Sequence, residues 1–338
     1  MRESALAMKR RSGLRSPLNA SRCSQRPGRG AISAGQEEGE GPMRLGVMLP
    51  LGDIGGEPSA IREFAEAAEA MGFTNLGLPD HVLSGRPGEG EQSALSSGLY
   101  QDPLVCFGFL SAVCRPTTEF STQVLILPQR QAALVAKQAA CLDVLCGGRF
   151  RLGIGVGWNP VEFTGLNETF SNRGRRSAEQ VAVMQTLWAE PYVTFAGKYH
   201  RIEDAGINPL PVHRRIPVWF GGHVPQTLER IATLGDGWIM NAYPPGPEIE
   251  AEMDKLRRLT EAAGRDPAAV GLEVWISGGA GDEASWRAEA EYWKRLGATH
   301  LTLTNTFNRR HHKRIAGRGM ADHLAVMRRF VAAVADVV

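Results

Sequence analysis

Regular alternation between strand-like and helix-like segments is the feature that most restricts how this sequence can fold. Short apolar segments predict eight strands, at residues 44–50, 75–79, 120–127, 151–157, 216–220, 237–240, 271–276 and 300–304. Segments with one apolar helical face accompany them, at residues 59–71, 104–113, 132–145, 173–188, 227–234, 248–263, 283–296 and 321–337. This alternation predicts parallel strands with crossover helices. Eight units predict a closed (β/α)8 TIM barrel, and an open doubly wound sheet is the alternative.

The spacing between these elements indicates where a functional site would form. Residues 82–102 and 158–172 are long strand-to-helix connections, and an irregular region at 190–215 contains a predicted hairpin that turns at Gly197. Connections longer than about 12–15 residues without regular structure are usually functional or disordered. Strand-to-helix loops of a barrel all lie at its C-terminal face, where active sites form. We therefore expect the insertions to build a site on that face.

The first 42 residues differ in composition from the rest. They contain eight Lys and Arg residues, four Glu residues and almost no apolar periodicity, which predicts a disordered extension. A transit-type peptide and a start of translation at Met43 are two further interpretations. We expect residues 43–338 to form the barrel domain.

Charge and cysteine content restrict the classes of partner. The chain has 38 Lys and Arg against 36 Asp and Glu, a formal net charge of +2. This balance gives no bulk attraction to nucleic acid or anionic membranes, and no apolar run reaches the roughly 18 residues needed to cross a bilayer. Five cysteines without a CxxC pair predict reduced thiols in a cytoplasmic protein. The histidines lack the spacing of a metal site, so we expect no metal.

Asp80 and His81 follow the second predicted strand and would lie at the barrel mouth. An imidazole titrates near neutral pH, so His81 is a candidate to move a proton or to hydrogen-bond a cofactor. Asp80 is a candidate to orient it. A turn with two ordinary polar residues is the alternative.

The fourth predicted strand carries glycines on one face. Gly153, Gly155 and Gly157 alternate with apolar residues in the segment RFRLGIGVGWNP. Positions without side chains would let a flat ring or a phosphate approach the backbone, with Trp158 closing the pocket or stacking beside it. A barrel layer that needs small residues is the other interpretation. The segment is not a dinucleotide GxGxxG motif, because no helix follows at the right point.

Two further segments are candidates to bind an anion. Gly221, Gly222 and His223 follow the fifth predicted strand and lead into a helix, whose first N–H groups and dipole favour a phosphate. A plain tight turn is the alternative. The basic run at residues 309–314 follows the eighth strand and is either a solvated loop or a contact for an anionic cofactor tail or substrate.

Together these segments resemble the bacterial luciferase-like monooxygenase superfamily, in particular its branch that uses the deazaflavin coenzyme F420. The resemblance covers nearly all of residues 43–305. The segments that carry it, in order, are MRLGVMLP, LGLPDH, VLILPQR, GGRFRLGIGVGWNPVEF, RGRRSAEQVAVMQTLW, IPVWFGG and LGDGWIM.

The resemblance implies that the cofactor's isoalloxazine-like ring lies at the C-terminal face of the barrel. Asp80 and His81 would lie near the ring, with His81 handling a proton. A bulge with a cis peptide near Val124 and Leu125 would back the ring. The implied cofactor-binding residues are Val124, Leu125, Gly155, Gly157, Trp158, Asn159, Gly221, Gly222 and His223.

One position departs from the sugar-phosphate dehydrogenases of that branch. They place a proton-donating glutamate just after the glycines of strand 4, where this sequence has Trp158 followed by Asn159. The departure argues against a sugar-phosphate reaction and leaves the substrate open.

The resulting expectation is an F420-dependent oxidoreductase that exchanges a hydride with a small organic substrate. An FMNH2-dependent monooxygenase that uses O2 and a separate flavin reductase is one alternative, and a non-catalytic flavin-binding barrel is another. We expect a homodimer.

Overall fold

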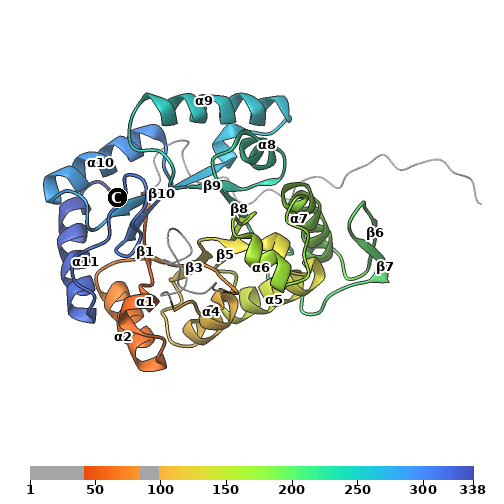
Figure 1. Ribbon diagram of the computed structural model, residues 1–338, viewed down its shortest axis with the longest axis horizontal. Coiled ribbons are helices and arrows are strands. Elements are labelled where there is room, and N and C mark those ends of the chain that lie inside the picture. Colours follow the sequence, from red (N-terminus) through yellow and green to blue (C-terminus); the bar gives the residue numbers. More distant parts are fainter. Residues whose placement is uncertain (1–41, 84–98) are drawn as a thin grey trace, which may run out of the picture. The chain divides into compact units, whose positions relative to one another are not determined.

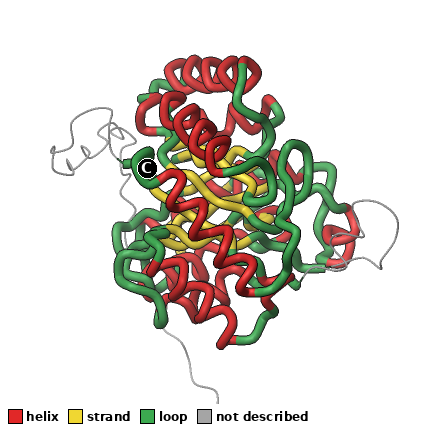
Figure 2. The backbone as a smooth tube through the Cα atoms, turned by 90° about the vertical axis from the view of Figure 1, so that its left-hand side faces the viewer, coloured by secondary structure: helices red, strands yellow, loops and turns green. Residues whose placement is uncertain are grey.

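The computed structural model describes residues 42–83 and 99–338, which form a closed barrel of parallel strands surrounded by helices (Figures 1 and 2). The barrel strands are β1 (Arg44–Met48), β2 (Asn75–Leu78), β3 (Glu119–Thr122) with its continuation β4 (Leu125–Ile126), β5 (Phe150–Gly155), β8 (Val218–Gly221), β9 (Gly237–Met240), β10 (Gly271–Ser277) and β11 (His300–Thr304). Each pairs in parallel with its neighbours, and the β3–β5 pairing closes the ring. The predicted TIM barrel is confirmed, and the open sheet is excluded. Residues 1–41 of the predicted extension lie outside the described residues.

Helices cover the outer surface of the barrel, as Figure 2 shows. The longer ones are α2 (Pro58–Ala70), α4 (Pro103–Ser111), α5 (Ala132–Leu145), α7 (Arg173–Ala189), α8 (Pro225–Leu234), α9 (Pro247–Ala262), α10 (Glu283–Leu296) and α11 (Met320–Val334). Short helical segments are α1 (Leu51–Ile54), η1 (Leu127–Gln129), α6 (Pro160–Gly165) and η2 (Pro267–Ala269), and the predicted hairpin is β6 (Val193–Ala196) with β7 (Arg201–Ala205). Within the described ranges, no helix combines the length and apolar character needed to cross a membrane.

The third barrel strand is interrupted, where the sequence predicted one strand over residues 120–127. Phe120 pairs with Phe150 and Leu125 with Ile154, so β3 and β4 use one residue more than β5 over the same distance. An extra residue of this kind is a bulge. The peptide bond between Gln123 and Val124 is cis, one residue before the place that the family resemblance implies.

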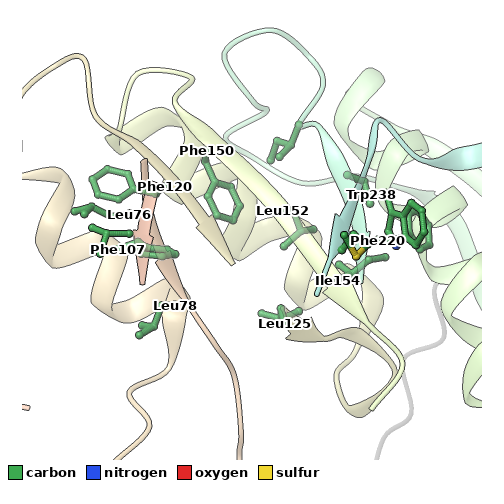
Figure 3. Close-up of a cluster of buried hydrophobic side chains, with 14 of the residues drawn as sticks. Leu76, Leu78, Phe107, Phe120, Leu125, Phe150, Leu152, Ile154, Phe220 and Trp238 are labelled. Atoms are coloured by element: carbon green, nitrogen blue, oxygen red, sulfur yellow. The ribbon is translucent and has the colours of Figure 1, made fainter. Parts of the chain in front are cut away.

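Apolar side chains on the outer faces of the strands pack against the helices (Figure 3). Leu152 and Ile154 of β5 and Leu125 of β4 belong to this layer, each 1% exposed or less. Because the side chain of Leu125 faces this core, it is not available to a ligand at the barrel mouth. The prediction that Leu125 contacts a cofactor therefore rests on its backbone.

The inside of the barrel is layered. Near the N-terminal ends of the strands, Arg151 lies 2.9 Å from Glu119 and 2.5 Å from Glu273. Its guanidinium carbon lies 4.2 Å from the ring centroid of Trp219. Burial alone would raise the pKa of the Glu119 carboxyl, but the charge of Arg151 holds it below its usual value. Above this layer an apolar cluster fills the barrel, formed by Met48, Trp219, Ile239 and Trp275.

Candidate functional site

A buried carboxylate holds His81 at the C-terminal face of the barrel. Nδ1 of His81 lies 3.2 Å from Oε2 of Glu162, and Oε1 of Glu162 accepts the backbone N–H groups of Val82 at 2.9 Å and Leu83 at 3.4 Å. The Glu162 side chain is 1% exposed and the His81 side chain 15% exposed. The pair therefore joins the end of β2 to α6, two segments that are far apart in the sequence.

The ionisation of Glu162 decides what the pair can do. Burial alone would raise its pKa, but the hydrogen bond with His81 and the N–H groups of Val82 and Leu83 lower the pKa below its usual value. An ionised carboxylate only accepts hydrogen bonds, so Nδ1 of His81 must carry hydrogen. In the neutral ring this leaves Nε2 as the atom that can take a proton.

Local capping explains why Glu162 lies there. Asn159 precedes α6, and its Oδ1 accepts the N–H of Val161 at 3.1 Å. Pro160 fills the first helical position, which needs no N–H donor. Glu162 then follows in the first turn, on the short helix that faces the end of β2. Asn159, predicted to bind cofactor, is 1% exposed and acts here as a helix cap.

Asp80 has a different role from the one expected. Its carboxylate accepts the N–H of Ile126 at 3.0 Å and an Nη2–H of Arg130 at 2.7 Å. It therefore links the end of β4 to Arg130, the residue that follows η1, while Glu162 orients His81. The expected Asp80–His81 interaction is replaced by these contacts.

Aromatic rings surround His81. The Tyr100 ring lies edge-on to it at 4.9 Å between centroids, and the Trp158 ring at 6.2 Å. Trp158 is 40% exposed, and the guanidinium carbon of Arg309 lies 5.7 Å from its ring centroid. Burial and the Glu162 charge raise the pKa of Tyr100, which keeps its hydroxyl protonated. These rings form a partly apolar wall beside the imidazole.

Val124 lies where the barrel interior meets the mouth, packed on the apolar cluster. A Cβ on Gly155 would lie 2.5 Å from Val124 Cγ2, and a Cβ on Gly221 would lie 2.9 Å from Val124 Cγ1. A Cβ on Gly153 would lie 2.0 Å from the Thr122 carbonyl oxygen. The glycines of β5 and β8 thus leave the space that the bulge between β3 and β4 occupies. This supports the small-residue interpretation of strand 4 rather than open space for a ring.

Gly157 and Trp158 form the bend that follows β5. Gly157 has φ +71°, a left-handed conformation that favours glycine. A Cβ there would lie 2.7 Å from Ile126 Cγ2. The tight bend turns Trp158 toward His81, on the same rim of the barrel.

The turn after β8 leads into a helix that no side chain caps. Gly222 has φ +111°, and its carbonyl accepts the Trp238 Nε1–H at 2.7 Å. Val224 precedes α8 and has no side-chain acceptor for its first N–H groups. Nε2 of His223 lies 3.1 Å from Nη2 of Arg310, and burial and this positive charge lower the pKa of His223. Arg310 thereby brings the predicted basic run to this turn.

Two arginines that the sequence did not single out lie between α7 and α8. Arg173 donates from Nε to the Gly157 carbonyl at 3.1 Å. Nη2 of Arg230 would be 2.5 Å from a Cβ on Gly174, so Arg230 lies against the first turn of α7. Burial lowers the pKa of Arg230, and Arg173 lowers it further. The region beside Gly157 is therefore cationic.

Glu162 is the functional residue that the sequence interpretation missed. The signal was present as an asparagine and a proline followed by a glutamate, a typical helix start. These residues fall inside the strand-to-helix connection predicted at 158–172. Tyr100 lies just beyond a segment, residues 84–98, that falls outside the described residues.

A family model described as luciferase-like monooxygenase matches residues 42–336. An uncharacterized protein of Mycobacterium tuberculosis is 32% identical over 209 residues, which cover 60% of this chain and 71% of the relative. An F420-dependent glucose-6-phosphate dehydrogenase of Kineococcus radiotolerans is 27% identical over 265 residues, 76% of this chain and 74% of the relative.

Solved structures show the same fold at low sequence identity. An F420-dependent secondary alcohol dehydrogenase, in complex with an F420–acetone adduct, has a TM-score of 0.69 at 18% identity and covers 88% of this chain and 99% of its own. The monooxygenase RslO1 from Streptomyces bottropensis has a TM-score of 0.69 at 17% identity, covering 87% and 99%.

Proposed function

Because this chain belongs to the luciferase-like monooxygenase family, we propose that it is a cytoplasmic F420-dependent oxidoreductase acting on a small organic substrate. Members of the family are oxidoreductases and monooxygenases, and relatives of both kinds are found. The observation that carries the proposal is the His81–Glu162 pair at the barrel mouth, beside Val124.

The residues at the mouth fit a planar cofactor with an anionic tail. Val124 is partly buried against an apolar cluster and would offer a ring an apolar contact. The uncapped start of α8, Gly222 and the cationic region of Arg173 and Arg230 fit a phosphate or carboxylate. Bound there, F420 would supply or accept the hydride.

His81 would move the proton that accompanies hydride transfer. Glu162 fixes the ring through Nδ1 and stabilises the imidazolium that forms when Nε2 takes a proton. This is the orienting role that a carboxylate has beside a catalytic histidine in hydrolase triads. Tyr100 and Trp158 would limit the access of water to the pair.

The substrate is best sought outside the sugar phosphates. The family resemblance implies a proton-donating glutamate in sugar-phosphate dehydrogenases at the place where this sequence has Trp158 and Asn159. Glu162 does not replace it, because its pKa is lowered and it remains ionised at neutral pH. His81 would then be the proton-handling side chain for a substrate that needs one such group, such as an alcohol or ketone.

An FMNH2-dependent monooxygenase is the second candidate, supported by the structural likeness to a monooxygenase. The reaction would need O2 and a separate flavin reductase. The pair at His81 suits either chemistry, so the cofactor must be tested directly.

A titration separates these candidates. Purified protein is titrated with F420 and with FMN, each oxidised and reduced, and cofactor fluorescence is followed. Tighter binding of F420, with F420 turnover across a panel of alcohols and ketones, supports the proposal. Consumption of O2 with reduced FMN would overturn it in favour of the monooxygenase. Binding without turnover of either cofactor would favour a non-catalytic barrel.

We also propose that the protein works as a homodimer joined through α4 and α5, which contact each other. Both helices carry outward-facing stripes without charge, where a surface helix normally places charged residues. The stripes consist of Val105 and Gly108 on α4 with Ala112 directly after it, and Leu134, Gln138, Cys141 and Leu145 on α5. Val105 is 68% exposed and Leu145 65% exposed.

Light scattering after size exclusion tests the dimer. We expect twice the chain mass for the unchanged protein and a monomer for the double variant Val105→Glu, Leu134→Glu. Val212→Glu, at an exposed loop valine, is the matched control and should remain dimeric. A monomer in the unchanged protein would refute this proposal.

A further inference from the structure

The loop between β11 and α11, residues 305–319, reaches across the mouth of the barrel. Around the ring of strands, β10, β9 and β8 separate β11 from β5 on one side, and β1, β2 and β3 separate them on the other. Trp158 lies just beyond the end of β5, yet the guanidinium carbon of Arg309 lies 5.7 Å from its ring centroid. Arg309 therefore reaches the opposite rim, where Trp158 lies beside His81.

Two neighbours of Arg309 contact other parts of the mouth. Phe307 is partly buried against the apolar cluster inside the barrel, with its ring centroid 5.2 Å from that of Trp275. Nη2 of Arg310 lies 3.1 Å from Nε2 of His223, in the turn after β8. The loop thus covers the apolar cluster with one side chain and contacts the ends of β5 and β8 with two others.

The backbone of the loop needs to be held in this shape. Arg310 has φ +58°, a left-handed conformation that is uncommon outside glycine. Such a conformation persists where the surrounding structure holds it. The N–H of Ile315 binds the carbonyl of Asn305 at 2.9 Å, which joins the two ends of the loop. The contacts close to Ile315 therefore decide how the rest of the loop lies.

A buried carboxylate holds the loop at this point. Oδ2 of Asp53 accepts a hydrogen bond from Nη2 of Arg314 at 2.7 Å and lies 3.2 Å from Nε2 of His323. The side chain of Asp53 is 4% exposed and that of His323 is fully buried. Asp53 belongs to α1 and His323 to α11. One carboxylate therefore joins the loop to the helical segments on both sides of it.

The charge of Asp53 is the part of this contact that matters most. When one partner of a buried ion pair loses its charge, the other is left without compensation, and the segments that the pair joins are destabilised. Arg314 is 26% exposed, so it can turn toward water when its partner is removed. The loop would then lose its attachment to α1 while the barrel beneath it stays folded.

We propose that Asp53 is a positioning residue that holds the 305–319 loop across the barrel mouth and so fixes Phe307 and Arg309 above the site of His81. Asp53 acts through the loop, because it follows β1, which β2 and β3 separate from β5. The effect on catalysis rests on the proposed function. The attachment of the loop does not depend on the cofactor or the reaction.

Limited proteolysis with trypsin tests the attachment without any cofactor. Trypsin cleaves after Arg and Lys, so Arg309 and Arg310 report opening of the loop, and Arg257 within α9 reports opening elsewhere. Mass spectrometry assigns each cut. Asp53→Asn and Arg314→Gln should each speed cleavage after Arg309 or Arg310 at least about fivefold relative to cleavage after Arg257, because cleavage follows the population of the locally open state.

A second Asp–Arg pair supplies the matched control. Oδ2 of Asp336 accepts Nη2–H of Arg287 at 2.7 Å, on an exposed surface formed by α10 and the end of the chain. Asp336→Asn makes the same chemical change and should leave cleavage of the loop unchanged. The double variant Asp53→Asn, Arg314→Gln should be cleaved no faster than the faster single variant, since both changes remove one contact.

Steady-state kinetics test whether the loop positions the site. The assay uses the cofactor and the alcohol or ketone that give turnover in the titration above. In Asp53→Asn we expect KM to rise at least about fivefold, and by a larger factor than kcat falls, because the His81–Glu162 pair keeps its own contacts. Asp336→Asn should keep both constants.

Each result supports or overturns a stated part of the proposal. Loop cleavage in Asp53→Asn at the rate of the unchanged protein would overturn it, and so would faster cleavage with an unchanged KM. An equal rise in cleavage after Arg257 would show general destabilisation and would also overturn it. Absence of turnover with either cofactor would refute the proposed function, and the cleavage rates then decide whether Asp53 holds the loop.

Discussion

Replacing Glu162 with glutamine tests the active-site reasoning most directly, because it removes one charge and keeps the shape. The carboxylate accepts three hydrogen bonds, from His81 and from the N–H groups of Val82 and Leu83. Each hydrogen bond to a charged group contributes about 1.5–3 kcal/mol to the free energy of unfolding. Glutamine can still accept the backbone N–H groups at its oxygen. The loss should therefore correspond to one charged bond, about 1.5–3 kcal/mol of stability.

The same contact should matter more for turnover than for cofactor binding. Without the carboxylate, the imidazolium of His81 loses its stabilising partner, and the ring loses its fixed orientation. At about 1.4 kcal/mol for each factor of ten, we expect kcat to fall about 10- to 100-fold. The dissociation constant of the cofactor should change by less than about threefold, because Glu162 is buried behind His81.

Stability should also show the pH dependence of a lowered carboxyl pKa. Glu162 has a folded pKa below the unfolded value of 4.5. Its contribution is therefore complete above pH 4.5 and is lost as the pH falls through the folded pKa. Urea unfolding of both proteins at pH 7 and at several lower values should show the difference shrinking below pH 4.5.

The control is a second Glu–His pair on the hairpin side of α7. Oε1 of Glu179 lies 3.0 Å from Nδ1 of His200 and also accepts backbone N–H groups. Glu179→Gln should lower stability without lowering kcat. Equal loss of kcat in both variants, or unchanged kcat in Glu162→Gln, would refute the assigned role.

Three further predictions follow from single contacts. His81→Ala should lower kcat by at least about 100-fold, the usual scale for a general acid–base group, while the cofactor dissociation constant measured by fluorescence stays within about threefold; equal losses in both would contradict the proton role. Gly155→Ala places a methyl group 2.5 Å from Val124 and should cost about 1–3 kcal/mol in urea unfolding, with recovery in the double variant that adds Val124→Ala; a single variant as stable as the unchanged protein would contradict the packing. Burial, with His311 adding to it, lowers the pKa of His312 to about 4 from 6.5, so stability should fall by about 3 kcal/mol between pH 6.5 and pH 4 as the unfolded chain takes up the proton. His312→Gln should flatten this dependence, and an unchanged profile would count against it.

Much of the barrel followed from local sequence pattern. The bounds of α5, α10, β9 and β11 coincide with the predicted segments. Side-chain periodicity is a local property of the chain, so it identifies an element before its neighbours are known. The eightfold alternation then left few topologies to choose from.

The interruption of the third strand could not be predicted from its own residues. Residues 120–127 read FSTQVLIL, with no glycine or proline to mark a break. The bulge appears only in the register of β3 and β4 against β5. Gly155 of β5 and Gly221 of β8 are explained by the same bulge, because the space beside them is filled by Val124. A glycine in a strand indicates that another group lies close to the backbone, but it does not identify that group.

The sequence by itself determined the fold class, the family and the rim of the barrel where chemistry is possible, because each depends on patterns and motifs that are local. Only the tertiary structure decided which carboxylate serves His81. Asp80 is its neighbour in the chain, yet it binds Ile126 and Arg130, while Glu162, 81 residues away, reaches the imidazole. Hydrogen bonding depends on distance and direction in space, and the helix that starts at Pro160 supplies both.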